Sequence, residues 1–452
     1  MHRFRVAASA ALLFAVLPAT SAAANASTPT CHGHRATLVG TSGHDRLVGT
    51  PGSDVIVARG GKDRISGRAG NDIVCAGPGD DNVHVGAGND RVYAGPGWDT
   101  VRGGADNDRV YGGHGSDTLR GDAGDDRVSG DLDAYFADRG GQNLVGDKLD
   151  GGPGDDVIDP GLDTRHAGGA SDTPDILDYR RAEQGVHVDL SSSTGIVTGE
   201  GTDRILVEGP LRVYGSMHGD DIVGSAYADT LEGGPGADHI DGGPGDDMIS
   251  ADGDFAYESH AADDVVDGGP GDDDITSNGG HDMLNGSDGA DLLNGFGGPV
   301  ATLRGGPGND YLFFYYKTHN TEVIARGAGS DVLDVQVKGE AYSPEVSMHA
   351  DSGAHTVVAS LAGADPTSVF GIQRWSLDSS QPWVFDGAAG RDVILRYGPS
   401  RLTARTGGGA DSVWATTGDD IIDAGAGTDT VHGWRGHDVC RNAEHVTGCE
   451  SQ

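Results

Sequence analysis

Aliphatic residues recur at every ninth position along the first third of the chain. Residues 40–129 divide into ten consecutive nonapeptides without an insertion. Three residues of each unit, such as "RVY" at 91–93, place one aliphatic side chain between two outward-facing residues, which is the alternation of a minimal β-strand. The other six, such as "AGPGWD" at 94–99, are rich in turn-forming residues. The aliphatic eighth positions are Leu47, Ile56, Ile65, Val74, Val83, Val92, Val101, Val110, Leu119 and Val128.

This period predicts an all-β parallel β-roll, a β-solenoid of nonapeptide repeats with irregular β interruptions. A strand and a turn make half a coil, so two units complete one coil and each unit lies on the unit two places earlier. Coils stacked at ~4.8 Å would bury the aliphatic positions in a thin core between two parallel sheets. No unit could bury that side alone, so stability requires the array.

The sixth position of every unit in this block is aspartate, and the fourth is glycine in all but one, where Asp106 stands. Stacking would place these carboxylates ~4.8 Å apart, where two like charges repel by about 0.9 kcal/mol even in water. The chain has 31 Lys and Arg residues against 70 Asp and Glu residues, too few to neutralise the columns. A hard divalent cation held by carboxylates and turn carbonyls fits, and Ca²⁺ suits a flexible all-oxygen site better than Mg²⁺. The ten aspartates are Asp45, Asp54, Asp63, Asp72, Asp81, Asp90, Asp99, Asp108, Asp117 and Asp126.

Three later units have glycine at positions 1, 2 and 4, aspartate at position 6 and an aliphatic residue at position 8: "GGPGDDVID" (151–159), "GGPGADHID" (233–241) and "GGPGDDMIS" (242–250). They resemble the haemolysin-type (RTX) calcium-binding nonapeptide, G-G-x-G-x-D-x-U-x. The resemblance implies a parallel β-roll with several Ca²⁺ ions held between successive turns on each edge. It also implies that the sixth-position Asp supplies a side-chain oxygen and that the turn glycines supply carbonyl oxygens.

The array resumes after each interruption, and the same position again carries aspartate. Counting one site for each pair of stacked turns within the longer blocks gives about 14 calcium sites. The short insertions at 130–141 and 251–258 follow complete units and are predicted to be loops between coils. Their D-x-D openings (Asp131/Asp133 and Asp252/Asp254) lack the EF-hand glycine and terminal Glu, so no separate calcium loop is predicted there. The later candidate ligands are Asp156, Asp220, Asp229, Asp238, Asp247, Asp264, Asp273, Asp282, Asp291, Asp310, Asp331, Asp392, Asp411, Asp420, Asp429 and Asp438.

These blocks and interruptions predict the following organisation. We expect a signal peptide over 1–26, because Arg3 and Arg5 precede an apolar run and small residues. A calcium β-roll with its cap follows over 27–159, a degenerate β linker over 160–214, and a second calcium block with short insertions over 215–334. A motif-free β segment over 335–386 precedes a C-terminal calcium β-roll with a disulfide cap over 387–452. Within 314–386 the strand-like runs predict calcium-free coils or a side sheet.

An exported chain permits disulfides, and the four cysteines lie at the two ends of the array. We predict the pairs Cys31–Cys75 and Cys440–Cys449, which would cover the exposed ends of a solenoid. Buried free thiols are the alternative. The formal net charge of −39 makes nucleic acid and anionic membranes poor partners, and no apolar run is long enough to span a bilayer.

The function predicted from these features is a secreted, extracellular calcium-binding repeat protein and not an enzyme. Ca²⁺ would drive its folding outside the cell, and the roll would serve as a structural or surface- and polysaccharide-binding module. Outward positions on one sheet (Arg91/Tyr93, Arg109/Tyr111, Arg127/Ser129) could bind a cell-wall or extracellular polysaccharide; cross-strand pairs that only stabilise the sheet are the alternative. The rival function is a secreted hydrolase or epimerase carrying RTX repeats, with its chemistry in 160–214 or 314–386. No G-x-S-x-G, H-E-x-x-H or Walker motif occurs in the chain.

Overall fold

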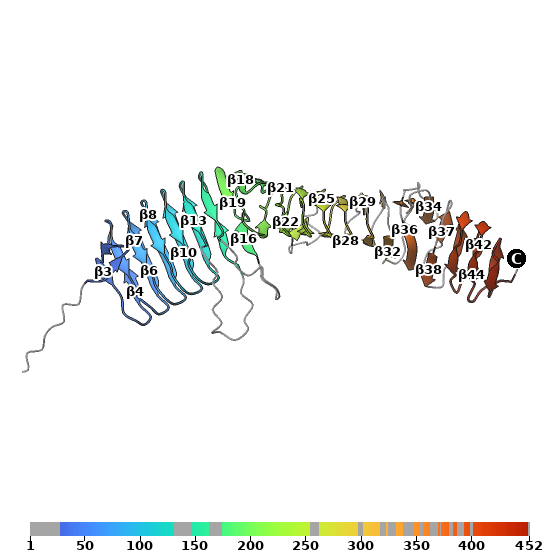
Figure 1. The fold of residues 1–452 in the computed structure, drawn as a ribbon, viewed down its shortest axis with the longest axis horizontal. Coiled ribbons are helices and arrows are strands. Elements are labelled where there is room, and N and C mark those ends of the chain that lie inside the picture. Colours follow the sequence, from blue (N-terminus) through green and yellow to red (C-terminus); the bar gives the residue numbers. More distant parts are fainter. Residues whose placement is uncertain are drawn as a thin grey trace, which may run out of the picture.

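The computed structural model is an elongated stack of coils with the C-terminus at one end (Figure 1). Its strands are short, and no α-helix and no apolar helix long enough to cross a bilayer occurs among the described residues. The predicted signal peptide, Asp131, Asp133, Asp254 and Asp392 lie outside the described residues. The structure describes residues 28–130, 146–161, 174–253, 262–296, 302–316, 322–323, 331–337, 347–351, 356–361, 369–370, 372–378, 383–386, 393–397 and 401–450.

The first long sheet receives one strand from every coil, and its neighbours pair in parallel throughout. In pairing order its strands are β4 (Arg46–Val48), β6 (Arg64–Ala69), β8 (Asn82–Ala87), β10 (Thr100–Ala105), β12 (Thr118–Ala123), β14 (Lys148–Asp150), β16 (Asp175–Asp178), β20 (Leu211–Tyr214), β22 (Thr230–Glu232), β24 (Met248–Ser250), β26 (Asp274–Ser277), β28 (Leu292–Phe296), β30 (Tyr311–Tyr316), β32 (Asp331–Val337), β36 (Ile372–Asp378), β38 (Val393–Tyr397), β41 (Ser412–Trp414), β44 (Thr430–His432) and β46 (His445–Thr447).

The second long sheet is formed by the alternate units and is parallel except around β18. In pairing order its strands are β3 (Leu38–Val39), β5 (Val55–Val57), β7 (Ile73–Cys75), β9 (Arg91–Tyr93), β11 (Arg109–Tyr111), β13 (Arg127–Ser129), β15 (Val157–Asp159), β19 (Thr202–Leu206), β18 (Thr194–Thr198), β17 (His187–Asp189), β21 (Asp221–Val223), β23 (His239–Asp241), β25 (Val265–Pro270), β27 (Met283–Asp288), β29 (Thr302–Arg304) and β31 (Glu322–Val323).

A third sheet runs through the C-terminal part and mixes antiparallel with parallel pairs. It comprises β33 (Ser347–Asp351), β34 (Thr356–Leu361), β37 (Trp383–Asp386), β39 (Leu402–Arg405), β42 (Ile421–Asp423) and β45 (Val439–Arg441), and β35 (Val369–Phe370) pairs with β34. There are also two separate two-stranded sheets among the described residues. One consists of β1 (Thr30–Cys31) and β2 (His34–Arg35), and the other of β40 (Gly408–Gly409) and β43 (Ala426–Gly427).

The register confirms that two nonapeptides make one coil. Val92 pairs with Val110, and Val110 pairs with Val128, so each residue lies beside the one 18 positions later. The eighth-position aliphatic residues of the first block are buried, and Val92 and Val110 are fully so. Their side chains form a core one residue thick between the two sheets, which is the predicted parallel β-roll.

The exception at the fourth position shows how strongly the turn constrains the backbone. Asp106 replaces the usual glycine and adopts φ +74°, in the left-handed region. Aspartate tolerates that conformation better than most residues do. The turn geometry is therefore kept where the glycine is lost.

The described residues of the interruption at 160–214, which are 160–161 and 174–214, lie within or beside the two long sheets. Strands β16 and β20 continue the first sheet in parallel register, while β17, β18 and β19 form antiparallel pairs within the second. Within 314–386, β32 and β36 extend the first sheet, whereas β33, β34 and β35 pair antiparallel in the third.

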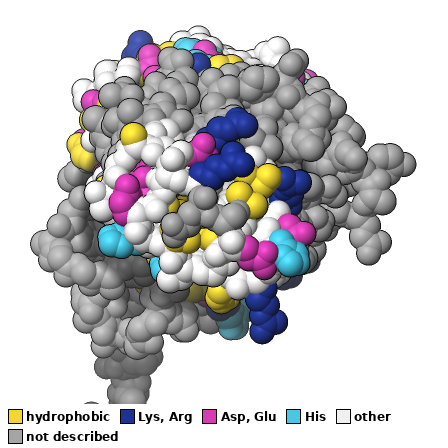
Figure 2. Space-filling model, turned by 90° about the vertical axis from the view of Figure 1, so that its right-hand side faces the viewer, with side chains coloured by type: hydrophobic (Ala, Val, Ile, Leu, Met, Phe, Trp, Pro, Cys, Tyr) yellow, Lys and Arg dark blue, Asp and Glu magenta, His cyan; other side chains and the backbone are white. Residues whose placement is uncertain are grey.

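The cysteines pair as predicted at the two ends of the roll. The Cα atoms of Cys31 and Cys75 lie 5.7 Å apart, and those of Cys440 and Cys449 lie 5.9 Å apart. Cys31 belongs to the antiparallel β1–β2 hairpin, and Cys440 occupies a fully buried core position in β45. From the C-terminal side, the described side chains show charges of both signs and histidines around small apolar areas (Figure 2). A polar outer surface of this kind keeps a terminal repeat soluble.

Candidate metal centre

The sixth-position aspartates form two columns, one on each edge of the roll. Each backbone N–H donates to Oδ1 of the aspartate one coil further on; for example, Asp72 N–H lies 2.6 Å from Asp90 Oδ1, and Asp90 N–H lies 2.8 Å from Asp108 Oδ1. Alternate units fill the two columns because successive strands enter opposite sheets. One column contains Asp45, Asp63, Asp81, Asp99 and Asp117, and the other contains Asp54, Asp72, Asp90, Asp108 and Asp126.

The second carboxylate oxygen of most column residues is buried and accepts no hydrogen bond from the described part of the chain. Burying a charged oxygen that has no hydrogen-bond partner destabilises the folded state far more than burying one that is hydrogen-bonded. A cation placed against these oxygens would remove that cost. The residues with such an Oδ2 atom include Asp63, Asp72, Asp81, Asp90, Asp99, Asp108, Asp126, Asp156, Asp238, Asp247, Asp264, Asp273, Asp291, Asp429 and Asp438.

Backbone carbonyls converge on the same space. A Cβ atom placed on Gly103 would lie 2.4 Å from Asp108 Oδ2 and 2.5 Å from the carbonyl oxygen of Gly121 on the next coil. A side chain there would fill the gap between a carboxylate and a carbonyl oxygen. Oxygens of these two types are the preferred ligands of Ca²⁺, so the residues present fit that ion.

The columns continue across the insertions, which the sequence count did not anticipate. Asp117 N–H donates to Asp147, and Asp147 N–H donates to Asp175; on the other edge, Asp126 is followed by Asp156 and Asp203. Sequence reasoning missed Asp147, Asp175 and Asp203 because their turns lack the glycine pattern. Each nevertheless keeps the D-x-aliphatic triplet (DKL, DIL and DRI), and this signal could have found them.

The second block likewise forms two uninterrupted columns. Asp238 N–H donates to Asp264 Oδ1, and Asp247 N–H donates to Asp273 Oδ1, so the turns before and after the 251–258 insertion are stacked. The count of about 14 sites omitted these two pairs, because it counted the runs of units before and after the insertion separately. One column contains Asp220, Asp238, Asp264 and Asp282, and the other contains Asp229, Asp247, Asp273, Asp291 and Asp310.

Near the C-terminus, the backbone N–H of Asp411 donates to Asp429 Oδ1, and the backbone N–H of Asp420 donates to Asp438 Oδ1. Asp429 N–H then donates to Glu444, which therefore takes an aspartate position, again within an acidic-x-aliphatic triplet (EHV). Asp331 begins β32, but its side chain is outside the described set, as is the whole of Asp392.

Apolar residues divide the columns into blocks. Val186, Leu211 and Leu402 each donate a backbone N–H to the next aspartate but have no carboxylate to offer. Leu211 lies beside Asp175 in the sheet, directly between Asp175 and Asp229. The carboxylate columns are therefore broken at the linker even though the sheets continue.

Burial shifts the acidity of the column residues. It raises the pKa of Asp90 to about 7 and the pKa of Asp108 to about 8, and neighbouring carboxylates add to the effect. Burial also raises the pKa of Asp99 to about 8. The N–H donated by the preceding aspartate favours the charged form and offsets part of each shift.

A pH dependence of calcium binding follows from these raised pKa values. The metal-free folded chain binds more protons than the unfolded chain, so its stability falls as pH rises from about 4 through about 8. Ca²⁺ requires the deprotonated carboxylates, so its affinity for the folded chain rises across the same range. Folding by Ca²⁺ starts from an unfolded chain whose carboxylates have ordinary pKa values and ends with deprotonated, ion-bound carboxylates. We therefore expect the Ca²⁺ concentration at half-folding to change little between pH 8 and pH 5.5 and to rise as the pH falls through about 4. Circular dichroism titrations at pH 8, 5.5 and 4 measure this; a midpoint at pH 4 equal to that at pH 8 would contradict it.

Comparison with known proteins supports this reading of the edges. A family model described as the RTX calcium-binding nonapeptide repeat (4 copies) matches residues 39–74, 76–110, 102–136, 146–164, 214–249, 260–293, 277–298 and 405–440. The matched segments span about half of the chain, and they contain most of the stacked carboxylates described above; Asp175, Asp203, Asp310 and Glu444 lie outside them. No curated protein matches the chain in a sequence search. The chain belongs to the RTX calcium-binding nonapeptide repeat family, and its β-roll binds multiple Ca²⁺ ions.

Proposed function

We propose that this protein is exported and that Ca²⁺, bound between stacked turns, drives its folding outside the cell. The observation that carries the proposal is the in-register columns of buried carboxylates, in which residues such as Asp90 and Asp108 have an Oδ2 atom with no hydrogen-bond donor among the described residues. In this proposal the sixth-position aspartates and the first-position carbonyls hold the ions. Extracellular calcium modules bind at roughly 10⁻⁴ to 10⁻³ M, which would leave the chain unfolded before export.

We further propose that the folded roll binds an extracellular anionic polysaccharide through one outward surface, named here the Tyr–Arg surface (Arg91, Tyr93, Arg109, Tyr111). The rings of Tyr93 and Tyr111 stack with centroids 5.0 Å apart, and His32 stacks on Tyr93 at 3.6 Å. Arg91 and Arg109 are paired in register on the same strands and are exposed.

The Tyr–Arg surface is shorter than the sequence indicates. Ser129, which was predicted to face outward, is 4% exposed, and Arg127 forms an ion pair with Asp159 at 3.3 Å. Because His32 and Tyr111 both stack on Tyr93, the rings present their edges and phenolic hydroxyls to a sugar, and the guanidinium groups offer bidentate donors to a carboxylate or sulfate.

Binding to two immobilised glycans in Ca²⁺ tests the second proposal. The protein is expected to be retained on hyaluronate, an anionic polymer, and not on neutral dextran, with retention falling as salt rises. Tyr93→Ser with Tyr111→Ser, and separately Arg91→Ser with Arg109→Ser, should each reduce retention by about tenfold or more, since an aromatic or bidentate contact is worth over a kcal/mol.

The matched control is Arg64→Ser, which removes an exposed arginine from β6 on the other sheet and should leave retention unchanged. Equal retention of wild type and both double variants would refute the proposed surface. Calcium-driven folding is tested separately, without a glycan.

A further inference from the structure

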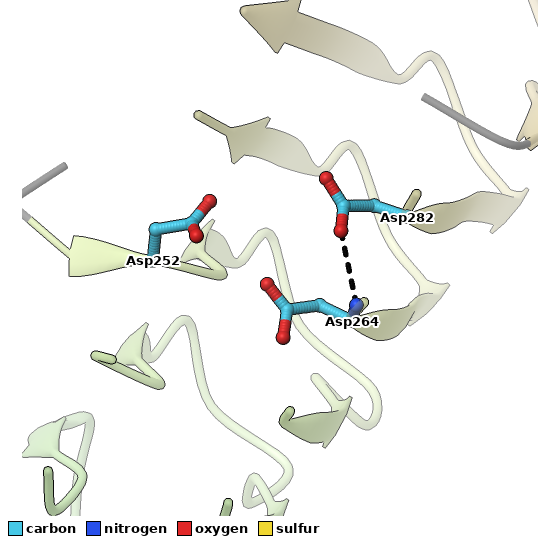
Figure 3. A group of neighbouring side chains, drawn as sticks. All are labelled: Asp252, Asp264 and Asp282. Atoms are coloured by element: carbon cyan, nitrogen blue, oxygen red, sulfur yellow. Dashed lines mark hydrogen bonds between the residues drawn. The ribbon is translucent and has the colours of Figure 1, made fainter. Parts of the chain in front are cut away.

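Three carboxylates converge at the turn interrupted by the 251–258 insertion. One oxygen from each of Asp252, Asp264 and Asp282 lies within 4.8 Å of the other two, and all three residues are buried. Figure 3 shows the three carboxylates turned toward one another, with Asp252 and Asp264 at the two ends of the interrupted turn and Asp282 on the next coil. Among the described residues, this group alone brings three potential metal-ligating side chains together, whereas the columns elsewhere stack carboxylates one above another.

Asp264 provides an independent sign that this space takes a cation. Its side chain is 0% exposed, and its Oδ1 accepts the N–H of Asp238 at 2.9 Å. Its Oδ2 accepts no hydrogen bond from the described chain. Within the described residues, no Lys or Arg forms an ion pair with Asp252, Asp264 or Asp282.

The other two members have partly satisfied carboxylates. Asp282 Oδ1 accepts the N–H of Asp264 at 2.9 Å, and the hydroxyl of Ser277 donates to Asp282 Oδ2. Asp252 Oδ2 accepts the N–H of Asn278 at 2.6 Å, which fixes the side chain while leaving its other oxygen available. Asp252 is 6% exposed, so its charge is removed from water.

Asp252 is not a sixth-position residue. It comes after the complete unit at 242–250, at the second position of the interrupted unit, where the family pattern has glycine. The insertion thus begins with a side-chain carboxylate at a turn position that otherwise presents only backbone. Sequence reasoning found the D-x-D opening but looked for a self-contained loop site, whereas the structure places Asp252 against Asp264 and Asp282 of the roll.

We propose that Asp252 is a third carboxylate ligand, which makes the Asp252–Asp264–Asp282 turn the tightest Ca²⁺ site among the described coils. The inference rests on the proposed ligand role of the column aspartates and adds a residue that the repeat does not specify. A third negative ligand raises the affinity for a divalent cation, because calcium sites are tuned over several decades by the number of charged ligands. This site fills first as Ca²⁺ rises and is the last to empty.

The test compares the full-length protein with Asp252→Asn and with a matched control, Asp246→Asn. Asparagine keeps an oxygen to accept the N–H of Asn278. Asp246 also accepts a backbone N–H from the next coil, that of Asp272 at 3.0 Å, but it is exposed and lies outside the cluster. Each protein is equilibrated with decreasing free Ca²⁺, and its retained ions are counted by native mass spectrometry; calorimetry gives the affinities.

At free Ca²⁺ low enough to empty the weaker sites, wild type and Asp246→Asn are expected to retain one more ion than Asp252→Asn. The tightest dissociation constant should weaken in Asp252→Asn by about tenfold or more. Equal ion counts and equal tightest affinities in all three proteins would overturn the inference. If wild type itself binds no Ca²⁺, the proposed function fails instead; if Asp252→Asn folds normally at saturating Ca²⁺, the change is local to the site.

Discussion

In excess chelator, the protein is expected to lose most of its β-sheet circular dichroism and to recover it cooperatively as Ca²⁺ is added. The core is one residue thick, so its apolar burial must offset the repulsion within every carboxylate column. Adjacent carboxylates at ~4.8 Å repel by about 0.9 kcal/mol in water and by more where they are buried. Because a site exists only where two turns are stacked, binding free energy becomes folding free energy.

The number of ions bound at saturation measures how far the columns extend. The sequence count of about 14 sites omits the stacked pairs that span insertions or join single units. With one ion per stacked aspartate pair, the structure raises the expected number to about 21. The added pairs are Asp117–Asp147, Asp126–Asp156, Asp147–Asp175, Asp156–Asp203, Asp238–Asp264, Asp247–Asp273 and Asp291–Asp310.

A Ca²⁺ titration that starts in chelator and is followed by circular dichroism measures the folding. Calorimetry on the same samples measures the stoichiometry. A control titration with monovalent salt separates specific binding from screening of the −39 net charge, because screening alone needs no divalent ion. A fully folded spectrum in chelator, unchanged by Ca²⁺, would contradict the prediction.

Replacing Val92 by Asp is expected to destabilise the folded roll by about 3–5 kcal/mol, even at saturating Ca²⁺. Val92 is fully buried between the sheets and pairs in register with Val74 and Val110. A carboxylate there is surrounded by aliphatic side chains and has no cation within the core, so the full desolvation cost applies. That loss is a large fraction of the stability of an ordinary domain.

Two companion variants assign the cause. Asn82→Asp introduces the same side chain at an exposed position of β8 and should change stability by less than about 0.5 kcal/mol. Asp90→Ala removes a column carboxylate and should raise the Ca²⁺ needed for folding, with a smaller loss than Val92→Asp once Ca²⁺ is saturating. Urea unfolding in excess Ca²⁺ gives the three free energies. Equal tolerance of Val92→Asp and Asp90→Ala would mean that the assigned register is wrong.

The nine-residue period by itself determined the local structure of this protein. An aliphatic residue between two outward residues specifies a strand, and the glycine-rich remainder specifies the turn. Because the period is constant, the partner of Val92 is necessarily 18 residues away, and the aspartate columns follow from the same arithmetic. The cysteine pairs were also predictable, since a solenoid needs its two ends covered.

Only the tertiary structure decided which residues stack where the period fails. An insertion can take many lengths at small entropic cost, so the sequence does not reveal that Asp238 meets Asp264 or that Asp117 meets Asp147. The stacking of the following coil restores the register. It also places Asp175, Asp203 and Glu444 in the carboxylate columns, although the glycine pattern does not precede them. Asp252 joins Asp264 and Asp282 for the same reason. Contacts between coils depend on how the chain returns after a loop, whereas contacts within a coil are fixed by the repeat itself.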